Sequence, residues 1–170
     1  MLQALRQLVD DGLPCALVLL GDGEMRAAIE AEITRLGLRG CVTLGGWTSS
    51  SGVREHILAS RAMVLPSLAE NLPLALVESL ALGRPVISTY VGAIPELVKP
   101  GVCGWLVPAG SVEALAGAMR EALLAPLEVL DRMGREGAKR ASEQHNASAE
   151  AMKLAALFRA SLGRTGDGVA

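Results

Sequence analysis

Short apolar runs alternate along most of the chain with segments whose apolar residues recur at helical spacing. Such runs are typical of strands in a parallel sheet, and the periodic segments between them predict helices. The predicted strands are Cys15–Leu20, Val42–Leu44, Ala62–Leu65, Pro85–Ser88 and Gly104–Val107. The predicted helices are Leu2–Asp10, Gly23–Leu36, Ser51–Ser60, Pro73–Leu82, Pro95–Lys99, Val112–Leu124 and an interrupted stretch from Leu127 to Leu162. This alternation predicts an α/β fold, an open parallel Rossmann-like sheet with helices on both faces.

The length of 170 residues suits one domain. We predict that this domain spans residues 1–162 and that residues 163–170 form a disordered tail. No apolar stretch approaches the ~18 residues that a membrane-spanning helix needs, and the N-terminus lacks the layout of a signal peptide. These features predict a cytoplasmic protein.

Charge and cysteine content exclude several classes of partner. The chain has 16 basic and 18 acidic residues, and they form no basic stripe, so no nucleic-acid partner is expected. Cys15, Cys41 and Cys103 lack CxxC spacing and lie beside apolar runs. They therefore predict buried reduced thiols, and neither a disulfide framework nor a metal site.

The segment from Glu70 to Glu78 carries the strongest chemical signal. It follows a predicted strand, and Pro73 suits the first turn of a helix that Gly83 would end. Free backbone N–H groups at such a helix start, with the positive end of the helix dipole, suit a phosphate or diphosphate. Glu78 lies in a stretch that is apolar on nearly every side, which predicts a buried carboxylate bound to a ligand hydroxyl. The alternative is a glutamate in solvent.

Glycines follow three other predicted strands. Gly21 and Gly23 either form a tight turn or contact a nucleotide. Their spacing alone is weak evidence for a dinucleotide site, so both interpretations stay open. Gly46 and Trp47 follow the next strand, and Trp47 is either a ligand contact or a surface-packing aromatic. Gly92 would let the backbone approach a ligand closely.

Several motifs together resemble the family 4 retaining glycosyltransferases. The central one runs from Pro66-Ser67 through Glu70 and Pro73 to Glu78 and the following Ser79–Ile87, with the two glutamates eight residues apart. The other motifs appear in the family's order, namely Leu19–Glu24, Val42–Gly45, Gly92–Val98 and Gly104–Val107. The resemblance covers roughly residues 13–120.

The resemblance implies the C-terminal, donor-binding half of a GT-B fold. It implies transfer of a sugar from a nucleoside diphosphate donor to an acceptor hydroxyl with retention, without a cofactor or a bound metal. Glu70 would be the catalytic contact to the donor sugar, and Glu78 would bind the ribose. Carried over in the same way, the other donor-binding residues would be Gly21, Gly23, Gly46, Trp47, Ser67, Asn71, Leu72, Pro73 and Leu74. Asn71-Leu72 replaces the glycine-aromatic pair of many relatives, so the resemblance does not predict which sugar is transferred.

The resemblance also predicts parts that this chain lacks. An acceptor glycan or lipid would bind through an N-terminal domain, and the complete protein would lie in the cytoplasm or at the inner face of the membrane. An opening strand would belong near the middle of the sheet, so a strand-swapped dimer is one predicted arrangement. The alternative function is a non-catalytic nucleotide-sugar-binding module or a fragment that is inactive without a partner domain. A glycosidase would also use paired carboxylates, but a helix start beside them favours phosphate.

Overall fold

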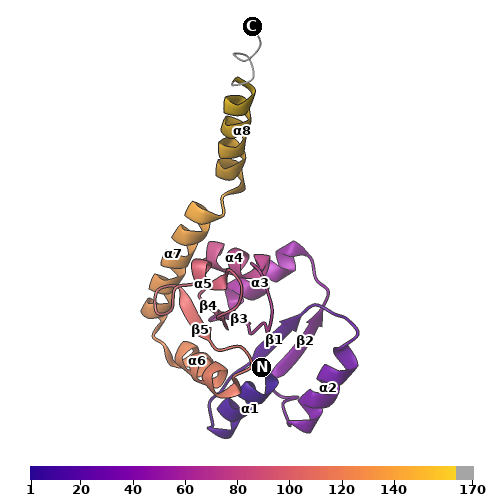
Figure 1. Cartoon of the computed structure of the whole chain (residues 1–170). Coiled ribbons are helices and arrows are strands. Elements are labelled where there is room, and N and C mark those ends of the chain that lie inside the picture. The colour runs from indigo at the N-terminus through magenta and orange to yellow at the C-terminus, as the bar shows by residue number, and fades with distance from the viewer. Residues whose placement is uncertain (164–170) are drawn as a thin grey trace.

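A computed structural model describes residues 1–163, in which parallel strands alternate with helices (Figure 1). The strands are β1 (Leu17–Leu20), β2 (Val42–Gly46), β3 (Met63–Leu65), β4 (Val86–Thr89) and β5 (Gly104–Val107). The helices are α1 (Leu2–Asp10), α2 (Arg26–Arg35), α3 (Ser50–Ala59), α4 (Leu74–Ala81), α5 (Ile94–Leu97), α6 (Val112–Leu124), α7 (Leu127–Gln144) and α8 (Ala147–Gly163). The α/β fold is confirmed, and each predicted element is present with ends shifted by at most three residues. Residues 164–170, most of the predicted tail, lie outside the described residues.

The strands form two parallel sheets, and not the single sheet that the alternation predicts. β1 pairs with β2, and β3, β4 and β5 form the second sheet with β4 in the middle. Within residues 1–163, β1 and β3 do not pair with each other. That an opening strand would lie near the middle of the sheet stays a prediction.

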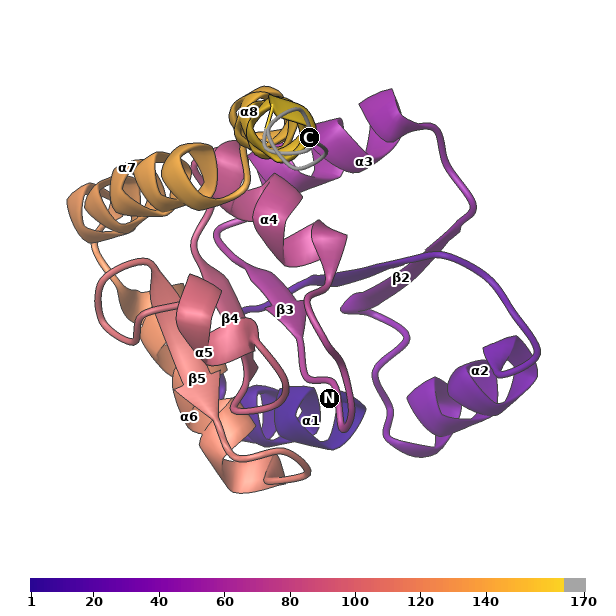
Figure 2. The same cartoon turned by 45° about the horizontal axis from the view of Figure 1, so that its top comes forward.

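Helices cover both faces of the strands (Figure 2). On one face, α1 packs against α6 and α2 lies beside them; on the other, α4 packs against α7. Each face has its own hydrophobic core. The first cluster contains Leu5, Leu8, Ile33, Ile87, Val107, Leu115 and Met119, and the second contains Leu76, Leu80, Val86, Ile94, Leu97, Leu106 and Ala141. Consecutive residues of β4, Val86 and Ile87, enter opposite clusters because side chains alternate along a strand.

Local sequence sets several helix ends. The Ser111 hydroxyl accepts a hydrogen bond from the Ala114 N–H (3.2 Å) and so caps α6, as its position before Val112 predicts. Gly83 ends α4 in the left-handed conformation (φ 71°). Its N–H donates to the Leu80 carbonyl and the Arg84 N–H to the Ser79 carbonyl, which is a Schellman motif.

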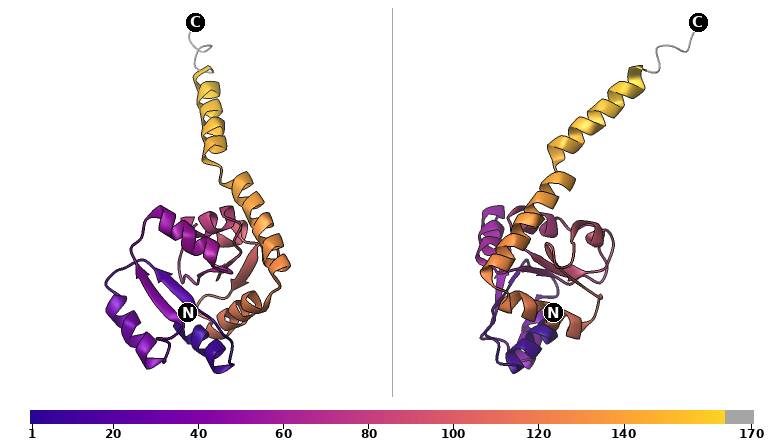
Figure 3. Two further views of the ribbon diagram at one scale, coloured as in Figure 1. Left: turned by 180° about the vertical axis from the view of Figure 1, so that it is seen from behind. Right: turned by 90° about the vertical axis from the view of Figure 1, so that its left-hand side faces the viewer.

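The C-terminal helices extend beyond the sheet layers. Asn146 precedes α8, and its side-chain oxygen accepts from the Ala149 N–H (3.1 Å). The helix runs away from the body (Figure 3). Its exposed apolar residues include Leu157 and Phe158. No helix within residues 1–163 combines the length and apolarity that a bilayer crossing requires.

The cysteine prediction is correct for one thiol only. Cys103 is buried, whereas Cys15 and Cys41 are half-buried, because they lie just before β1 and β2 at the less covered sheet. All three are free. Burial, and secondly the neighbouring Cys41, raises the pKa of the Cys15 thiol above its ordinary value.

Candidate functional site

The predicted site residues lie in or beside the loops that follow β1, β2 and β3. Loops that leave the carboxyl ends of parallel strands emerge at one edge of their sheet, which is where open α/β sheets bind ligands. The 66–73 loop follows β3, and the 90–93 loop follows β4 beside it. These two loops therefore define the main candidate site.

The 66–73 loop is held by hydrogen bonds to its carbonyl groups. The Thr89 hydroxyl donates to the Ser67 carbonyl (2.7 Å), and the Ala93 N–H donates to the Asn71 carbonyl (2.9 Å). The exposed Glu70 side chain turns back on the loop, where its Oε1 accepts from the Asn71 N–H (3.0 Å). The loop thus presents Glu70 to solvent on a fixed backbone.

The N-terminus of α4 is open. Pro73 lies just before the helix in an extended conformation (φ −73°, ψ 124°), so α4 starts one residue later than predicted. No side chain caps this end of the helix. Leu72 packs on the second cluster, while Leu74 is 73% exposed. The first backbone N–H groups of α4 and the positive end of its dipole therefore face an accessible surface, which suits an anion.

The prediction that Glu78 is a buried carboxylate is wrong. Its side chain is exposed, because α4 buries the stripe of Leu76, Ser79 and Leu80. Glu78 lies four residues after exposed Leu74, on the opposite stripe. The apolar residues around Glu78 in the sequence do not surround it in space, so its ionised form needs no buried partner and is open to a ligand.

The loops after β1 and β2 form a second group. The Gly21 N–H donates to the Gly46 carbonyl (2.8 Å), and both glycines have positive φ (112° and 64°). Trp47 follows and is 81% exposed. The β2 strand extends to Gly46, two residues beyond its predicted end.

Asp22 organises the turn between Gly21 and Gly23. Its carboxylate accepts from the Gly23 N–H (2.8 Å) and pairs with Arg26 (2.7 Å). These contacts, the backbone one first, lower the pKa of Asp22 below its ordinary value. The geometry agrees with the tight-turn interpretation and leaves nucleotide contact by Gly21 and Gly23 a prediction.

Two hydroxyl-bearing residues of β4 were not predicted as part of the site. Ser88 and Thr89 are fully buried, and each donates from its side chain to a carbonyl of the chain leaving β3. The available signal was a pair of polar residues at the end of an otherwise apolar strand. Such residues need hydrogen-bond partners when they are buried.

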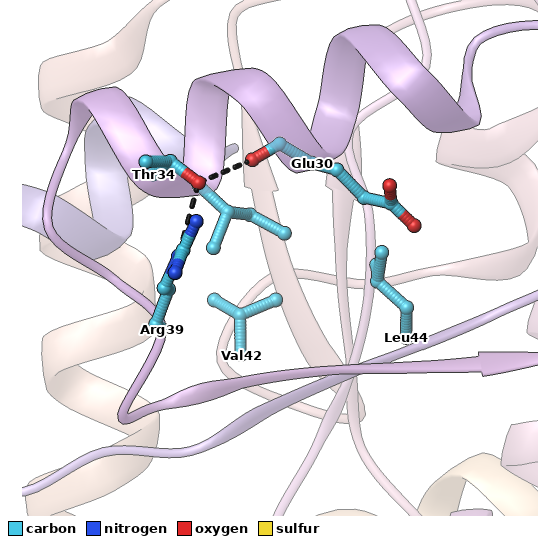
Figure 4. A pocket seen from close by; sticks show the side chains of 6 residues that line it. Glu30, Thr34, Arg39, Val42 and Leu44 are labelled. Atoms are coloured by element: carbon cyan, nitrogen blue, oxygen red, sulfur yellow. Dashed lines mark hydrogen bonds between the residues drawn. The ribbon is translucent and has the colours of Figure 1, made fainter.

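Two cavities lie near these elements. One of about 240 Å³ at the carboxyl edge of the three-stranded sheet is lined by Pro66, Leu68, Thr89, Val107 and Ser111, among others. The other, about 260 Å³, lies between α2 and β2 and is lined by Glu30, Ile33, Thr34, Arg39, Val42 and Leu44 (Figure 4). Arg39 Nε donates there to the Thr34 hydroxyl (3.1 Å), which donates to the Glu30 carbonyl (2.9 Å). Only the first cavity adjoins the predicted site.

Metal ligands do not gather in the part of the chain that the structure describes. No group of three or more His, Cys, Asp or Glu side chains within residues 1–163 is arranged to hold an ion. The expectation that the protein works without a bound metal stays a prediction.

Comparison with known proteins identifies the family. Residues 1–140 match the model of the glycosyl transferases group 1, and the chain belongs to this family. It is 30% identical over 158 residues to the alpha-D-kanosaminyltransferase of Streptomyces kanamyceticus, covering 93% of this chain and 41% of that protein. It is 29% identical over 164 residues to a putative colanic acid biosynthesis glycosyltransferase of Salmonella typhimurium, covering 93% and 40%.

Solved structures show the same architecture. The sucrose-phosphate synthase of Thermosynechococcus elongatus matches with a TM-score of 0.83 and 27% identity, over 95% of this chain and 42% of that one. Anabaena HepE, solved in complex with UDP, matches with a TM-score of 0.81 and 22% identity, over 92% and 43%. The chain therefore spans about two fifths of these proteins and has the fold of one half of a GT-B glycosyltransferase.

Proposed function

We propose that this chain is the C-terminal, donor-binding domain of a retaining family 4 glycosyltransferase that acts in glycan, polysaccharide or glycolipid biosynthesis. The donor is a nucleoside diphosphate sugar, and the acceptor is a hydroxyl group of a glycan or lipid. The observation that carries the proposal is the uncapped N-terminus of α4 with exposed Glu70 before it and exposed Glu78 on its first turns. An anion-binding helix start between two accessible carboxylates suits a diphosphate that links the donor sugar to the ribose, since both rings carry hydroxyl groups.

The reaction would break the bond between the sugar's anomeric carbon and the diphosphate oxygen and form one to the acceptor oxygen. The proton of the acceptor hydroxyl would pass to the leaving diphosphate. Negative charge grows on the leaving diphosphate. Within Asn71–Leu74 the Asn71 N–H already donates to Glu70 and Pro73 has no N–H. The Leu72 N–H and the first N–H groups of α4 would therefore stabilise that charge. Glu70 would contact the donor sugar, and Glu78 would accept hydrogen bonds from the ribose hydroxyls.

The nucleotide base would lie toward the second group of loops. Gly46 and exposed Trp47 offer backbone groups and an aromatic face there, with Gly21 and Gly23 alongside. Complexes of HepE with UDP and with UDP-glucose favour uridine as the first nucleoside to test. No metal is required in this proposal, because N–H groups take the role of countercharge.

Titration calorimetry with UDP, GDP and ADP, in the absence and presence of Mg²⁺, tests the donor site. We expect selective binding of one nucleotide without metal and a loss of about tenfold or more in Glu78→Ala, since a hydrogen bond to a charged acceptor contributes about 1.5–3 kcal/mol. Glu128→Ala is the matched control, because Glu128 is also exposed and near the start of a helix. Equal affinities in both variants would remove the ribose role from Glu78.

Catalysis would need a second domain. The chain covers 41% of its kanosaminyltransferase relative, and an acceptor site facing the donor would come from the rest of such a protein. We propose that this chain alone binds the donor without transferring sugar, and that the complete enzyme works in the cytoplasm or at the inner face of the membrane. Sugar transfer by the isolated chain to an added acceptor would contradict this proposal.

The gap between the two sheets supports a proposal about assembly. β1 and β3 each have one strand neighbour within residues 1–163, and Val18 of β1 is 42% exposed. We propose that two chains pair by strand exchange at these open edges. Light scattering should then show a dimer that Val18→Lys dissociates, whereas Val102→Lys, at a residue that is 45% exposed in a distant turn, leaves it intact. A monomer at all concentrations would exclude the dimer.

A further inference from the structure

The 90–93 loop contacts the backbone of the 66–73 loop at one glycine. Gly92 has φ 53°, and a Cβ placed on it would lie 2.0 Å from the Glu70 carbonyl oxygen and 2.7 Å from that of Asn71. Both atoms belong to the backbone, so a side chain at this position would displace the loop. The close approach expected of Gly92 is thus made to the loop that carries Glu70.

Hydrogen bonds reinforce this contact along the whole loop. The Ala93 N–H donates to the Asn71 carbonyl (2.9 Å), next to Gly92. Further back, Thr89 donates to the Ser67 carbonyl (2.7 Å) and Ser88 to the Leu65 carbonyl (2.8 Å). The donors lie in β4 and the 90–93 loop. They hold the 66–73 loop at two carbonyl groups, those of Ser67 and Asn71, and they also hold Leu65 at the end of β3, just before the loop.

Helix α5, which follows the 90–93 loop, is firmly packed. Ile94 and Leu97 of α5, directly after the 90–93 loop, are buried in the second cluster. Arg140 of α7 donates to the Leu97 carbonyl (3.0 Å) and the Glu96 carbonyl (2.8 Å) at the end of α5. The C-terminal end of the 90–93 loop is therefore fixed by α5. The loop in turn fixes the position of the Glu70 backbone that it contacts.

From this geometry we infer that Gly92 and Thr89 are positioning residues for the donor sugar, acting through the backbone of Glu70 and Ser67. The inference rests on the proposed donor site. Neither residue needs to touch the donor; together they set where the Glu70 carboxylate and the N–H groups after it lie. Because Glu70 faces the sugar and Glu78 the ribose, a displaced 66–73 loop weakens binding of the nucleotide sugar more than binding of the nucleotide.

Gly92→Ala and Gly101→Ala form a matched pair. Both glycines have positive φ (53° and 74°), but a Cβ on Gly101 would have no atom within 4 Å. Affinities for UDP-glucose and UDP, and for GDP-mannose and GDP, are measured by calorimetry on chains whose folding is checked by circular dichroism. We expect Gly92→Ala to lose about tenfold or more in nucleotide-sugar affinity and about twofold in nucleotide affinity, since small displacements at a site are costly. Gly101→Ala should keep both affinities.

Thr89 provides a second test that does not depend on the glycine variants. Thr89→Val keeps the shape and removes the hydroxyl, leaving the Ser67 carbonyl without its donor, while Thr89→Ser keeps the hydroxyl. We expect a selective loss of nucleotide-sugar affinity in Thr89→Val and recovery in Thr89→Ser.

The outcomes distinguish failure of the proposed donor site from failure of the positioning role of Gly92 and Thr89. If the unaltered chain binds none of the four probes, the proposed donor site fails, and the inference falls with it. If it binds them and Gly92→Ala matches Gly101→Ala while Thr89→Val matches Thr89→Ser, the donor site stands and the positioning role is overturned. Equal losses for nucleotide and nucleotide sugar would indicate general destabilisation and also overturn the role.

Discussion

β4 and β1 are both short strands of a parallel fold, yet they differ in how completely they are covered. All four residues of β4 are buried, including the hydroxyl-bearing Ser88 and Thr89. β1 contains only apolar residues, Leu17–Leu20, and none is fully buried; Val18 is 42% exposed. β4 has a strand on each side and a core on each face, whereas β1 has one strand neighbour.

This difference extends to the loops that the strands carry. The loop after β3 is held by the buried Thr89 hydroxyl of β4 and by the Ala93 N–H, and it packs closely against Gly92. The turn after β1 is held mainly by the Gly21–Gly46 hydrogen bond and by Asp22, which pairs with Arg26 near the surface. In the proposed donor site, the better-held loop would bind the diphosphate and the sugar, and the more open turn would lie beside the base.

Truncating one apolar side chain in each region should give the largest contrast. Leu80→Ala removes a fully buried side chain that packs at Gly137 of α7, and should lower the free energy of unfolding by about 2–5 kcal/mol. Val18→Ala should cost less than about 1 kcal/mol, because much of that side chain already contacts water. Urea unfolding of both variants measures the two values. Similar losses would mean that Val18 of β1 is as well covered as Leu80 in the second cluster.

A glycine in each region separates close strand packing from open surface. A Cβ on Gly104 of β5 would lie 2.1 Å from the Val86 carbonyl oxygen of β4, so Gly104→Ala should destabilise the chain by about 1–3 kcal/mol. Gly40 has no atom within 4 Å of such a Cβ, and Gly40→Ala should have little effect. Thermal and urea unfolding compare them. A tolerated alanine at Gly104 would show that β4 and β5 can separate at little cost.

The helix caps should be alike in both regions. Ser111 caps α6 and Ser49 caps α3, each by accepting an N–H bond of 3.2 Å. Ser111→Ala and Ser49→Ala should each cost about 1 kcal/mol, because a cap depends on its own helix start and not on the sheet beside it. Conservative Thr replacements should retain most of that stability. A clear difference between the two alanine variants would indicate that tertiary packing contributes to one cap.

The smallest effect is expected at Asp22, in the less covered region. Its pKa is lowered in the folded chain, so the ionised carboxylate stabilises the fold at pH values above the ordinary aspartate value of 3.8. That contribution is lost as the pH falls through the lower, folded-state pKa. The difference in unfolding free energy between the unaltered chain and Asp22→Asn should therefore be constant above about pH 5 and shrink toward acid. Asp131→Asn, at an exposed site on α7, is the control. An equal pH dependence in that variant would show that the contacts of Asp22 are not its cause.

Features that depend on near neighbours could be predicted from the sequence. The end of α4 at Gly83 appears where the sequence predicts it, and the caps of α6 at Ser111 and of α8 at Asn146 fall on residue types that favour helix starts. Each is decided by hydrogen bonds that span at most five residues. The order of strands and helices follows in the same way from hydrophobic periodicity.

Features that depend on distant contacts could not be predicted. Glu78 looks buried in sequence because its neighbours are apolar, but the side of α4 that packs is chosen by contact with α7, some 55 residues later. Gly92 looks like a ligand contact, but its space is filled by the backbone of Glu70 and Asn71.

The amino-acid sequence by itself determined the local elements of this protein, their caps and the placing of two glutamates around a helix start, because those depend on propensity and short-range hydrogen bonds. The tertiary structure alone decided that both glutamates are exposed, that the strands divide into two sheets, and that the buried Thr89 hydroxyl of β4 holds the loop before α4. Burial and loop position are properties of surfaces brought together from far apart in the chain. The packing of α4 on α7 and of β4 between its neighbours sets them.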